Sequence, residues 1–401
     1  MKRCSRLLVP AISCFLVWIF LLGEAEAALA DDIIRKAPQE TPKVAGLVLS
    51  PDDALPRVTA RSAVVMEART GRVLYERNMN DRRFPASTTK IMTLILALER
   101  GNLDDVVTVS AHAAGTEGST IWLEPGDKIT LRELLYGMML HSGNDATVAV
   151  AEHIAGSVDA FARLMTEKAK ELGATDTHFV NANGLPDDAH YTTAHDMALI
   201  ASYGYSLPGF EEIVSTKEIT FPWVKDDTHR LRNENQMLWL YEGGNGVKTG
   251  YTEAAGRCLV SAAKRDGIQL VAVVLDSNWM WNDSILLLDY GFREIETTTV
   301  VKQGMKVGSC TVSGSRTRRV EVQAAEDVVL PVIEGKAGYK QEVELPKALK
   351  APVAAGETIG KLHIYYEGKE VATTDLVAAQ AAERQSFFRT VWTGLCRLLG
   401  M

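Results

Sequence analysis

The chain has 401 residues, of which 46% are hydrophobic and 23% charged, so it can bury a core and is not globally disordered. Its net charge of −8, without any block of basic residues, disfavours a nucleic-acid partner, because phosphate binding needs a concentrated positive face. The cysteines are scattered and form no Cys-x-x-Cys pair, and no His-Glu-x-x-His occurs. We therefore expect neither a disulfide framework nor a metal site, and we expect no cofactor.

Residues 1–27 are typical of a secretory signal peptide. Basic residues precede an apolar run over residues 7–22, and residues 25–27, Ala-Glu-Ala, form a small-x-small cleavage site. An uncleaved N-terminal anchor is the alternative, but Pro10 and Ser13 interrupt the apolar run. Residues 28–60 contain several prolines and are expected to form an extended lead-in.

Residues 61–296 are expected to form one domain in which a sheet is flanked by helices. Strands are predicted at residues 63–67, 73–76, 246–252, 257–262 and 269–275. Helices are predicted at residues 87–100, 131–140, 145–154, 160–172 and 281–291. The helix at 87–100 is apolar around most of its circumference, which is typical of a helix buried at the centre of a domain.

The remaining chain is predicted to form a second domain and a tail. Residues 297–377 alternate polar and apolar side chains between Gly and Pro, which indicates a small all-β domain. Residues 378–401 are predicted to be a linker and an amphipathic membrane-anchoring helix, because Phe, Trp and Leu recur at helical spacing among arginines. This helix is too short and too polar to span a bilayer. A terminal helix packed on its own domain or in a dimer is the alternative.

A Ser-x-x-Lys motif, Ser87 to Lys90, begins the predicted central helix. The spacing puts both side chains on one face. A lysine among apolar neighbours has a lowered pKa and can take the proton of a serine hydroxyl, and the free N–H groups of a helix start can stabilise an oxyanion. The alternative is an N-cap serine with a surface lysine. A second Ser-x-x-Lys, Ser261 to Lys264, lies on a predicted strand and is expected to be structural.

Two further motifs place polar side chains where a substrate can be bound. Ser142-Gly-Asn144 lies in a break between two predicted helices, where a hydroxyl can relay a proton and an amide can donate to a substrate carbonyl. Lys248-Thr249-Gly250 lies on a predicted strand, whose edge can bind an extended peptide and whose Lys and Thr can bind a carboxylate. The alternatives are a capping turn for the first motif and an ordinary edge strand with a protective lysine for the second.

In this order, the three motifs resemble those of serine β-lactamases and penicillin-binding proteins. With Asn183-Gly-Leu185, the β-rich domain and the tail, the chain resembles the low-molecular-mass penicillin-binding proteins that act as D-alanyl-D-alanine carboxypeptidases. The resemblance implies an α/β (α+β) catalytic domain of the β-lactamase-like type over residues 61–296. It also implies a hydrolase that removes the terminal D-alanine from peptidoglycan stem pentapeptides.

The resemblance assigns a role to each motif residue. Ser87 would be the acylated nucleophile, Lys90 its base and Ser142 the proton relay. The implied substrate-binding residues are Asn144, Lys248, Thr249, Gly250 and Tyr251. Among them, Lys248 and Thr249 would hold the terminal carboxylate, and the backbone N–H groups of Ser87 and Tyr251 would form the oxyanion hole.

Three other functions are weighed against this one. A class A β-lactamase usually carries Ser-Asp-Asn and a Glu-x-x-x-Asn loop, and no such loop pattern occurs between Asn144 and Lys248, so a penicillin acyl-enzyme is expected to persist. A D,D-endopeptidase of the same fold and a β-lactam-binding protein without turnover both remain open. The expected partners are a peptide ending in D-Ala-D-Ala, β-lactams as covalent inhibitors, and the membrane surface on the extracytoplasmic side.

Overall fold

The computed structural model describes residues 55–385, apart from 225–228 and 333–337. The predicted signal peptide and the predicted terminal helix therefore lie outside the described residues. The chain divides into two compact units, the first holding most of the residues up to Gly291 and the second holding Arg69–Arg72, Lys264–Gln269 and the residues from Phe292 onward. Within the described residues, none of the helices combines the length and the apolar character that crossing a membrane requires.

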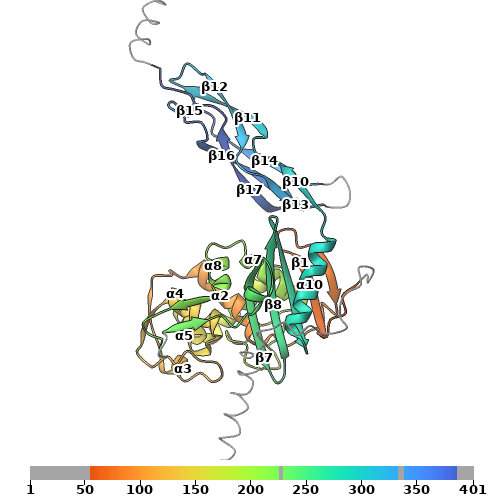
Figure 1. Cartoon of the computed structure of the whole chain (residues 1–401). Coiled ribbons are helices and arrows are strands. Elements are labelled where there is room, and N and C mark those ends of the chain that lie inside the picture. Colours follow the sequence, from red (N-terminus) through yellow and green to blue (C-terminus); the bar gives the residue numbers. More distant parts are fainter. Residues whose placement is uncertain (1–54, 225–228, 333–337, 386–401) are drawn as a thin grey trace, which may run out of the picture. The chain divides into compact units, whose positions relative to one another are not determined.

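The first unit is built on an antiparallel sheet of five strands in the order β2-β1-β9-β8-β7 (Figure 1). These strands are β1 (Ser62–Glu67), β2 (Val73–Arg77), β7 (Gly244–Thr252), β8 (Gly256–Arg265) and β9 (Ile268–Ser277). The β1 strand is buried along its whole length, because both faces of the sheet are covered. Each predicted strand of this domain is confirmed, with ends that differ by a few residues.

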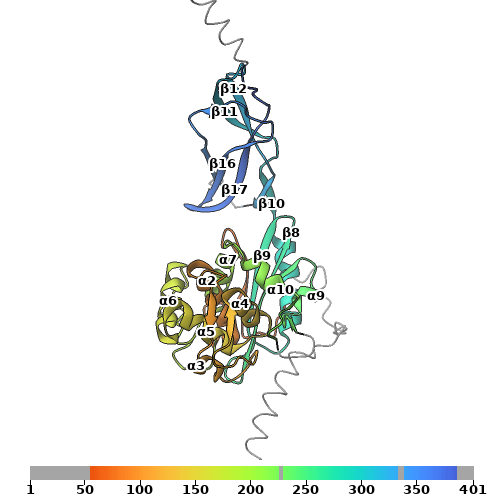
Figure 2. The same cartoon turned by 90° about the vertical axis from the view of Figure 1, so that its left-hand side faces the viewer.

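Helices cover the two faces of this sheet. Figures 1 and 2 show α10 on one face and the layer that holds α2, α4, α5 and α7 on the other, where α7 packs on β1. Val64 and Met66 of β1 belong to the core formed with these helices, whereas a Cβ at Gly291 of α10 would lie 2.9 Å from Val65. The side chains of β1 thus alternate between two helical layers, as the period of a strand requires.

The helices of the first unit are mostly those that the sequence indicates. They are α2 (Lys90–Arg100), α3 (Ala111–Ala114), α4 (Leu131–Leu140), α5 (Asn144–Ala155), α6 (Val158–Glu171), α7 (Ala194–Gly204), α8 (Phe210–Ser215), α9 (Met237–Leu240) and α10 (Met280–Glu294). The first eight residues of α2 are all buried, which confirms a central helix. Short strand pairs, β3 (Val106–Thr108) with β4 (Lys128–Thr130) and β5 (Glu218–Thr220) with β6 (Arg230–Arg232), lie between the helices.

The second unit is rich in strands, as predicted. Its six-stranded sheet has the order β14-β16-β17-β12-β11-β15, and β10 pairs with β13 beside it. The strands are β10 (Thr297–Val301), β11 (Lys306–Ser313), β12 (Arg319–Ala324), β13 (Val328–Pro331), β14 (Lys340–Glu344), β15 (Leu349–Lys350), β16 (Thr358–Tyr366) and β17 (Lys369–Ala378). Alternate residues such as Val320, Val322 and Leu376 are buried and form a core of its own.

The end of this unit differs from the expected linker. The β17 strand continues to Ala378, and beyond it Ala382 and Arg384 form bridges with Val353 and Ser315. The Gln385 N–H also donates to the Gly314 carbonyl at 2.8 Å. A composition rich in Ala and Gln indicated a linker, but the backbone groups of these residues still find partners in the β-rich unit.

Candidate active site

The predicted central helix begins with a turn of 3-10 helix, η1 (Ala86–Thr89), which runs directly into α2. In a 3-10 helix three residues make one turn, so side chains three apart lie one above the other. Ser87 Oγ is accordingly 3.0 Å from Lys90 Nζ. The alternative of an N-cap serine with a surface lysine is wrong, because Lys90 is fully buried and Pro85 occupies the N-cap position.

The amine of Lys90 has three polar neighbours. Besides Ser87, its Nζ lies 2.7 Å from Asn144 Oδ1 and 2.9 Å from the Asn183 carbonyl oxygen. A neutral amine has two N–H groups and one lone pair, so it can donate to Asn144 and Asn183 and accept a proton from Ser87. The geometry therefore suits a base that acts on the serine hydroxyl.

The electrostatic surroundings favour that neutral form. Burial sets the pKa of Lys90 well below its ordinary value, and the nearby Lys248 ammonium lowers it further. Glu234 and Asp145 act in the opposite direction and are outweighed. A lysine whose neutral form is favoured by its surroundings is suited to general-base catalysis.

Ser142 and Asn144 stand where α4 ends and α5 begins. Ser142 has a φ of +61° and is 4% exposed, and among the described residues its hydroxyl makes no hydrogen bond. Asn144 contacts Lys90 directly, whereas no hydrogen bond links Ser142 to Ser87 or Lys90 in the described part of the chain. The second motif thus reaches the site through its asparagine, and its serine keeps a hydroxyl with no protein partner.

Buried Asp145 holds a neighbouring segment beside this motif, a role that the sequence did not indicate. Its carboxylate accepts a hydrogen bond from Thr120 Oγ1 at 2.5 Å and from the Leu123 N–H at 3.0 Å. Next to it, Asn144 Nδ2 donates to the Glu117 carbonyl at 2.7 Å. The amide of Asn144 is therefore oriented at both ends, and one of its two N–H groups is left for a ligand.

The Lys-Thr-Gly motif lies on β7, at the edge of the sheet, as predicted. A Cβ at Gly250 would lie 3.0 Å from the backbone nitrogen of Ser87 and 3.1 Å from that of Thr88. Glycine is thus required for the close approach of β7 to η1. Tyr251 follows with its side chain 37% exposed, and the guanidinium of Arg257 lies 5.9 Å from the centre of its ring.

Lys248 and Thr249 are nearly fully buried and lie near a carboxylate. Lys248 Nζ is 3.4 Å from Thr249 Oγ1 and 3.9 Å from Glu234 Oε2. Thr249 Oγ1 in turn lies 3.5 Å from Glu234 Oε2. Burial lowers the pKa of Lys248, and the Glu234 carboxylate partly opposes that change.

The loop that carries Asn183 packs closely on the turn that carries Ser87. Gly184 has a φ of +91°, and a Cβ there would lie 1.8 Å from the Ala86 carbonyl oxygen. No other residue type fits this position without moving the backbone of η1. The Asn-Gly-Leu sequence forms part of the family resemblance, but its packing on the turn that carries Ser87 is not predictable from the sequence.

His190 supports the same turn from the end of this loop. Its Nδ1 accepts from the Val180 N–H at 3.1 Å, so its Nε2 carries the proton and donates to Thr89 Oγ1 at 2.9 Å. Burial lowers the pKa of His190 to about 4. The ring is therefore neutral at pH 7 and serves as a structural hydrogen-bonding group.

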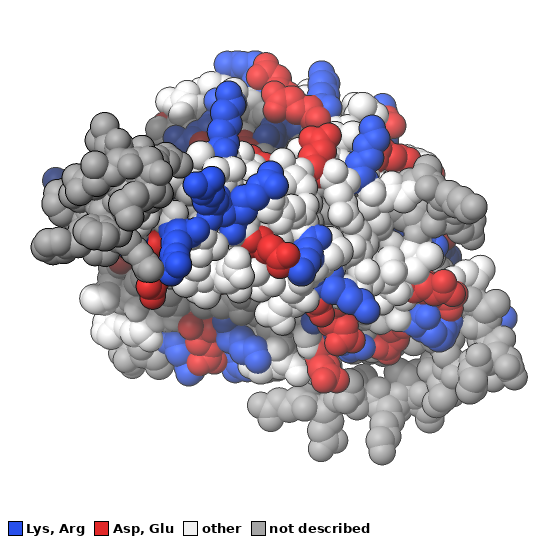
Figure 3. Space-filling view, turned by 90° about the horizontal axis from the view of Figure 1, so that it is seen from above, with Lys and Arg blue, Asp and Glu red and all other residues white. Residues whose placement is uncertain are grey.

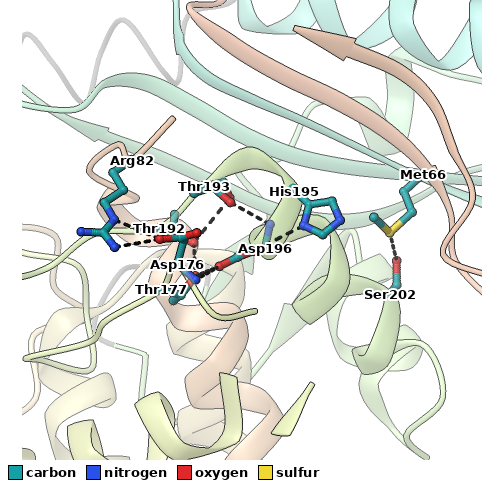
Figure 4. A network of polar contacts seen from close by, with 9 residues as sticks. All are labelled: Met66, Arg82, Asp176, Thr177, Thr192, Thr193, His195, Asp196 and Ser202. Atoms are coloured by element: carbon teal, nitrogen blue, oxygen red, sulfur yellow. Dashed lines mark hydrogen bonds and ion pairs between the residues drawn. The ribbon is translucent and has the colours of Figure 1, made fainter. Parts of the chain in front are cut away.

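A polar network anchors the ends of the loop (Figure 4). Asp196 in α7 accepts hydrogen bonds at 2.8 Å from the Asp176 N–H and from Thr177 Oγ1. Thr193 caps α7 by accepting from the Asp196 N–H at 3.0 Å, and Arg82 pairs with Asp176 at 2.7 Å. The loop that presents Asn183 is thus fixed at both ends to α7 and to the segment before η1.

The second Ser-x-x-Lys is structural, as expected. Ser261 and Lys264 both lie on β8, where residues three apart point to opposite faces. Ser261 Oγ donates to the Ala272 carbonyl at 3.3 Å, inside the sheet.

Comparison with known families agrees with the arrangement of these motifs. A family model described as D-alanyl-D-alanine carboxypeptidase matches residues 50–278. The chain belongs to the D-alanyl-D-alanine carboxypeptidase family. A second model, described as the C-terminal domain of penicillin-binding protein 5, matches residues 296–384 of this carboxypeptidase family member. The predicted family, fold class and type of enzyme are therefore confirmed.

Individual members of the family are similar over most of the chain. The D-alanyl-D-alanine carboxypeptidase DacF of Bacillus subtilis is 35% identical, covering 82% of this chain and 87% of its own. The structure of penicillin-binding protein 5 from Haemophilus influenzae is 32% identical with a TM-score of 0.58, covering 82% and 99%. A mutant of the Streptomyces K15 DD-transpeptidase is 34% identical with a TM-score of 0.57, covering 60% of this chain and 100% of its own.

Proposed function

We propose that this carboxypeptidase removes the terminal D-alanine of a peptide ending in D-Ala-D-Ala through an acyl-enzyme on Ser87. One observation carries the proposal: the fully buried amine of Lys90, whose pKa is strongly lowered, lies 3.0 Å from the hydroxyl oxygen of Ser87. Such an amine can accept the hydroxyl proton as the oxygen attacks a carbonyl carbon.

In the first half of the reaction, Ser87 Oγ forms a bond to the carbonyl carbon of the penultimate D-alanine while Lys90 takes its proton. The carbonyl oxygen becomes an oxyanion, which the N–H groups of Ser87 and Tyr251 stabilise. The close approach of Gly250 to the Ser87 nitrogen supports this assignment, because it brings the two backbone segments together.

Collapse of this intermediate breaks the C–N bond of the peptide. Ser142, whose hydroxyl has no protein partner in the described chain, relays the proton to the departing amine, so that D-alanine leaves neutral at nitrogen. Water then attacks the ester carbon while Lys90 takes one of its protons, and Lys90 passes that proton to Ser87 Oγ as the ester C–O bond breaks and the shortened peptide is released. Over the full cycle the enzyme returns to its starting protonation state.

Substrate binding follows from the groups that line this centre. The free N–H of the Asn144 amide donates to a carbonyl of the bound peptide, whose backbone lies along the edge of β7. Lys248 and Thr249 bind the terminal carboxylate with charge and hydroxyl. A β-lactam that carries a carboxylate at the matching place acylates Ser87 as a stable mimic of this substrate.

The enzyme is proposed to act on peptidoglycan stem pentapeptides at the extracytoplasmic face of the membrane. The sequence of residues 1–27 supports export, and the amphipathic pattern of residues 386–401 supports binding to the membrane surface. Within this proposal the domains are the catalytic domain at 61–296 and the β-rich domain at 297–377.

The decisive experiment measures D-alanine released from a defined pentapeptide, together with the mass of the protein after incubation with penicillin. We expect turnover by the wild-type protein and a single penicillin adduct on Ser87 that is released slowly. Ser87→Ala is expected to lose both, and an adduct on another residue would contradict the proposal. Cleavage of a cross-linked dimer in preference to the pentapeptide would indicate a D,D-endopeptidase. Penicillin labelling of Ser87 without release of D-alanine would indicate a binding protein.

A further inference from the structure

Glu234 lies beside the two residues proposed to bind the substrate carboxylate, although no sequence motif pointed to it. Its Oε2 is 3.9 Å from Lys248 Nζ and 3.5 Å from Thr249 Oγ1. Its side chain is 9% exposed, and its N–H donates to the Leu140 carbonyl at 3.0 Å, at the end of α4. The carboxylate is thus largely buried beside Lys248 and Thr249 and is not a solvated surface group.

The neighbouring charges make this position unusual for a site that receives an anion. The ammonium of Lys248 lies at ion-pair distance from Glu234. The amine of Lys90 instead contacts Ser87, Asn144 and Asn183. Within the described residues, Glu234 is the only carboxylate at ion-pair distance from Lys248. A substrate carboxylate that binds Lys248 and Thr249 therefore meets a second carboxylate that shares the same ammonium, and two such charges repel.

We propose that Glu234 is a specificity-determining residue that occupies the substrate carboxylate's place beside Lys248 and Thr249 in the free enzyme. Binding of a peptide with a free C-terminus is then an exchange of one carboxylate for another. Glu234 reduces the preference of the site for a charged C-terminus over an uncharged one. This inference rests on the proposed function, because it takes Lys248 and Thr249 as the carboxylate-binding pair.

A second effect of Glu234 has to be separated from this one. Its charge opposes the lowering of the pKa of both Lys90 and Lys248, so its removal changes the basicity of Lys90 as well. That change alters the chemical step for every substrate to the same extent. The ratio of kcat/KM for two substrates that differ only in the C-terminal charge cancels it.

The experiment therefore compares an N-acylated peptide ending in D-Ala-D-Ala with the same peptide as its C-terminal amide. Released D-alanine and D-alaninamide are quantified for the wild-type protein, Glu234→Gln, Glu234→Ala and Glu234→Asp. Glu218→Gln is the matched control, because Glu218 lies on β5 and pairs with Arg230 and Arg232. Penicillin labelling of Ser87 first establishes that each variant is folded.

In the two neutral variants the acid-to-amide ratio is expected to rise about tenfold, mostly through a lower KM for the acid, since one repelling charge is gone. Glu234→Asp, which keeps the charge, and Glu218→Gln are expected to stay near the wild-type ratio. An unchanged or lower ratio in the neutral variants overturns the inference, and so does an equal rise in Glu234→Asp. Failure of the proposed function looks different: the wild-type protein then releases nothing from either peptide, and the inference falls with it.

Discussion

At the scale of single residues, the reactivity proposed for Ser87 depends on the surroundings of one amine. Lys90 loses hydration on burial and lies near a second lysine, so its neutral form is favoured. The structure holds that amine between Asn144 and Asn183 and aims it at the serine. The position of the amine is therefore set by Asn144 and Asn183, and its protonation state by burial and by Lys248.

The first prediction concerns this amine. Lys90→Gln is expected to slow acylation by penicillin by about 10³-fold, within the range for loss of a general base. In the wild-type protein, the acylation rate should increase as pH rises through the pKa of Lys90, because the neutral amine is the active form. Since that pKa is well below the usual value for lysine, the increase should come at a lower pH than for an ordinary lysine.

Lys264→Gln is the matched control for this variant, because Lys264 occupies the same place in the second Ser-x-x-Lys and is exposed on β8. It should acylate at the wild-type rate, which is followed by mass spectrometry across the pH range. A wild-type rate that falls with increasing pH from acid to neutrality would contradict the assignment of Lys90 as the base.

The sequence predicts the reactive residues better than the residues around them. Ser87, Lys90, Asn144 and Lys248 stand in short motifs whose chemistry can be recognised from residue type and spacing. Glu234 lies in no such motif, and it reaches Lys248 only because the chain folds back between β6 and β7. Contacts of this kind depend on tertiary structure and leave no local pattern in the sequence.

At the scale of elements, the site depends on how closely three segments approach one another. Gly250 brings β7 onto η1 from one side, and Gly184 brings the Asn183 loop onto η1 from the other. A helix at residues 87–100 was predictable from its apolar run, but its 3-10 first turn was not. That turn begins at Ala86, whose φ of +48° shows a backbone shaped by its packing and not by residue preference.

The second prediction tests this close packing with Gly184→Ala. The substitution adds left-handed backbone strain and a Cβ that would lie 1.8 Å from the Ala86 carbonyl, so the free energy of unfolding should fall by roughly 3 kcal/mol or more. Displacement of the catalytic turn should also slow acylation of Ser87 in the protein that remains folded. Denaturant unfolding and penicillin labelling measure the two effects.

Gly173→Ala separates strain from contact. Gly173 has a φ of +86°, close to that of Gly184, but a Cβ there meets nothing within 4 Å. This control should lose only about 1 kcal/mol and acylate normally. Equal losses of unfolding free energy in Gly184→Ala and Gly173→Ala would show that the contact with η1 contributes nothing to stability.

At the scale of the whole molecule, the two units have separate hydrophobic cores. The alternation of residues after 297 was enough to predict a β-rich domain, because strand period and exposure leave a clear pattern. The sheet order of that domain was not predictable, since pairing between distant strands leaves no such pattern.

Figure 3 shows basic and acidic side chains interspersed on the face that it draws.

The third prediction for this protein uses two truncations, one ending at residue 385 and one ending at residue 294, after α10. Both should be acylated by penicillin at the rate of the full-length protein, because every proposed catalytic residue lies in the first unit. The first unit also has a hydrophobic core of its own, which supports its independent folding. Neither truncation should sediment with anionic lipid vesicles, whereas the full-length protein should, because the amphipathic pattern lies beyond residue 385.

The two truncations distinguish membrane binding by the tail from membrane binding by the β-rich unit. Ending at residue 385 keeps the bridges of Ala382 and Arg384, so the β-rich unit stays complete and only the tail is lost. Vesicle binding that persists in this truncation but disappears in the shorter one would assign the membrane contact to the β-rich unit instead of the tail. Loss of acylation in the shorter chain, with its circular dichroism spectrum intact, would mean that the first unit needs the second to hold its active site.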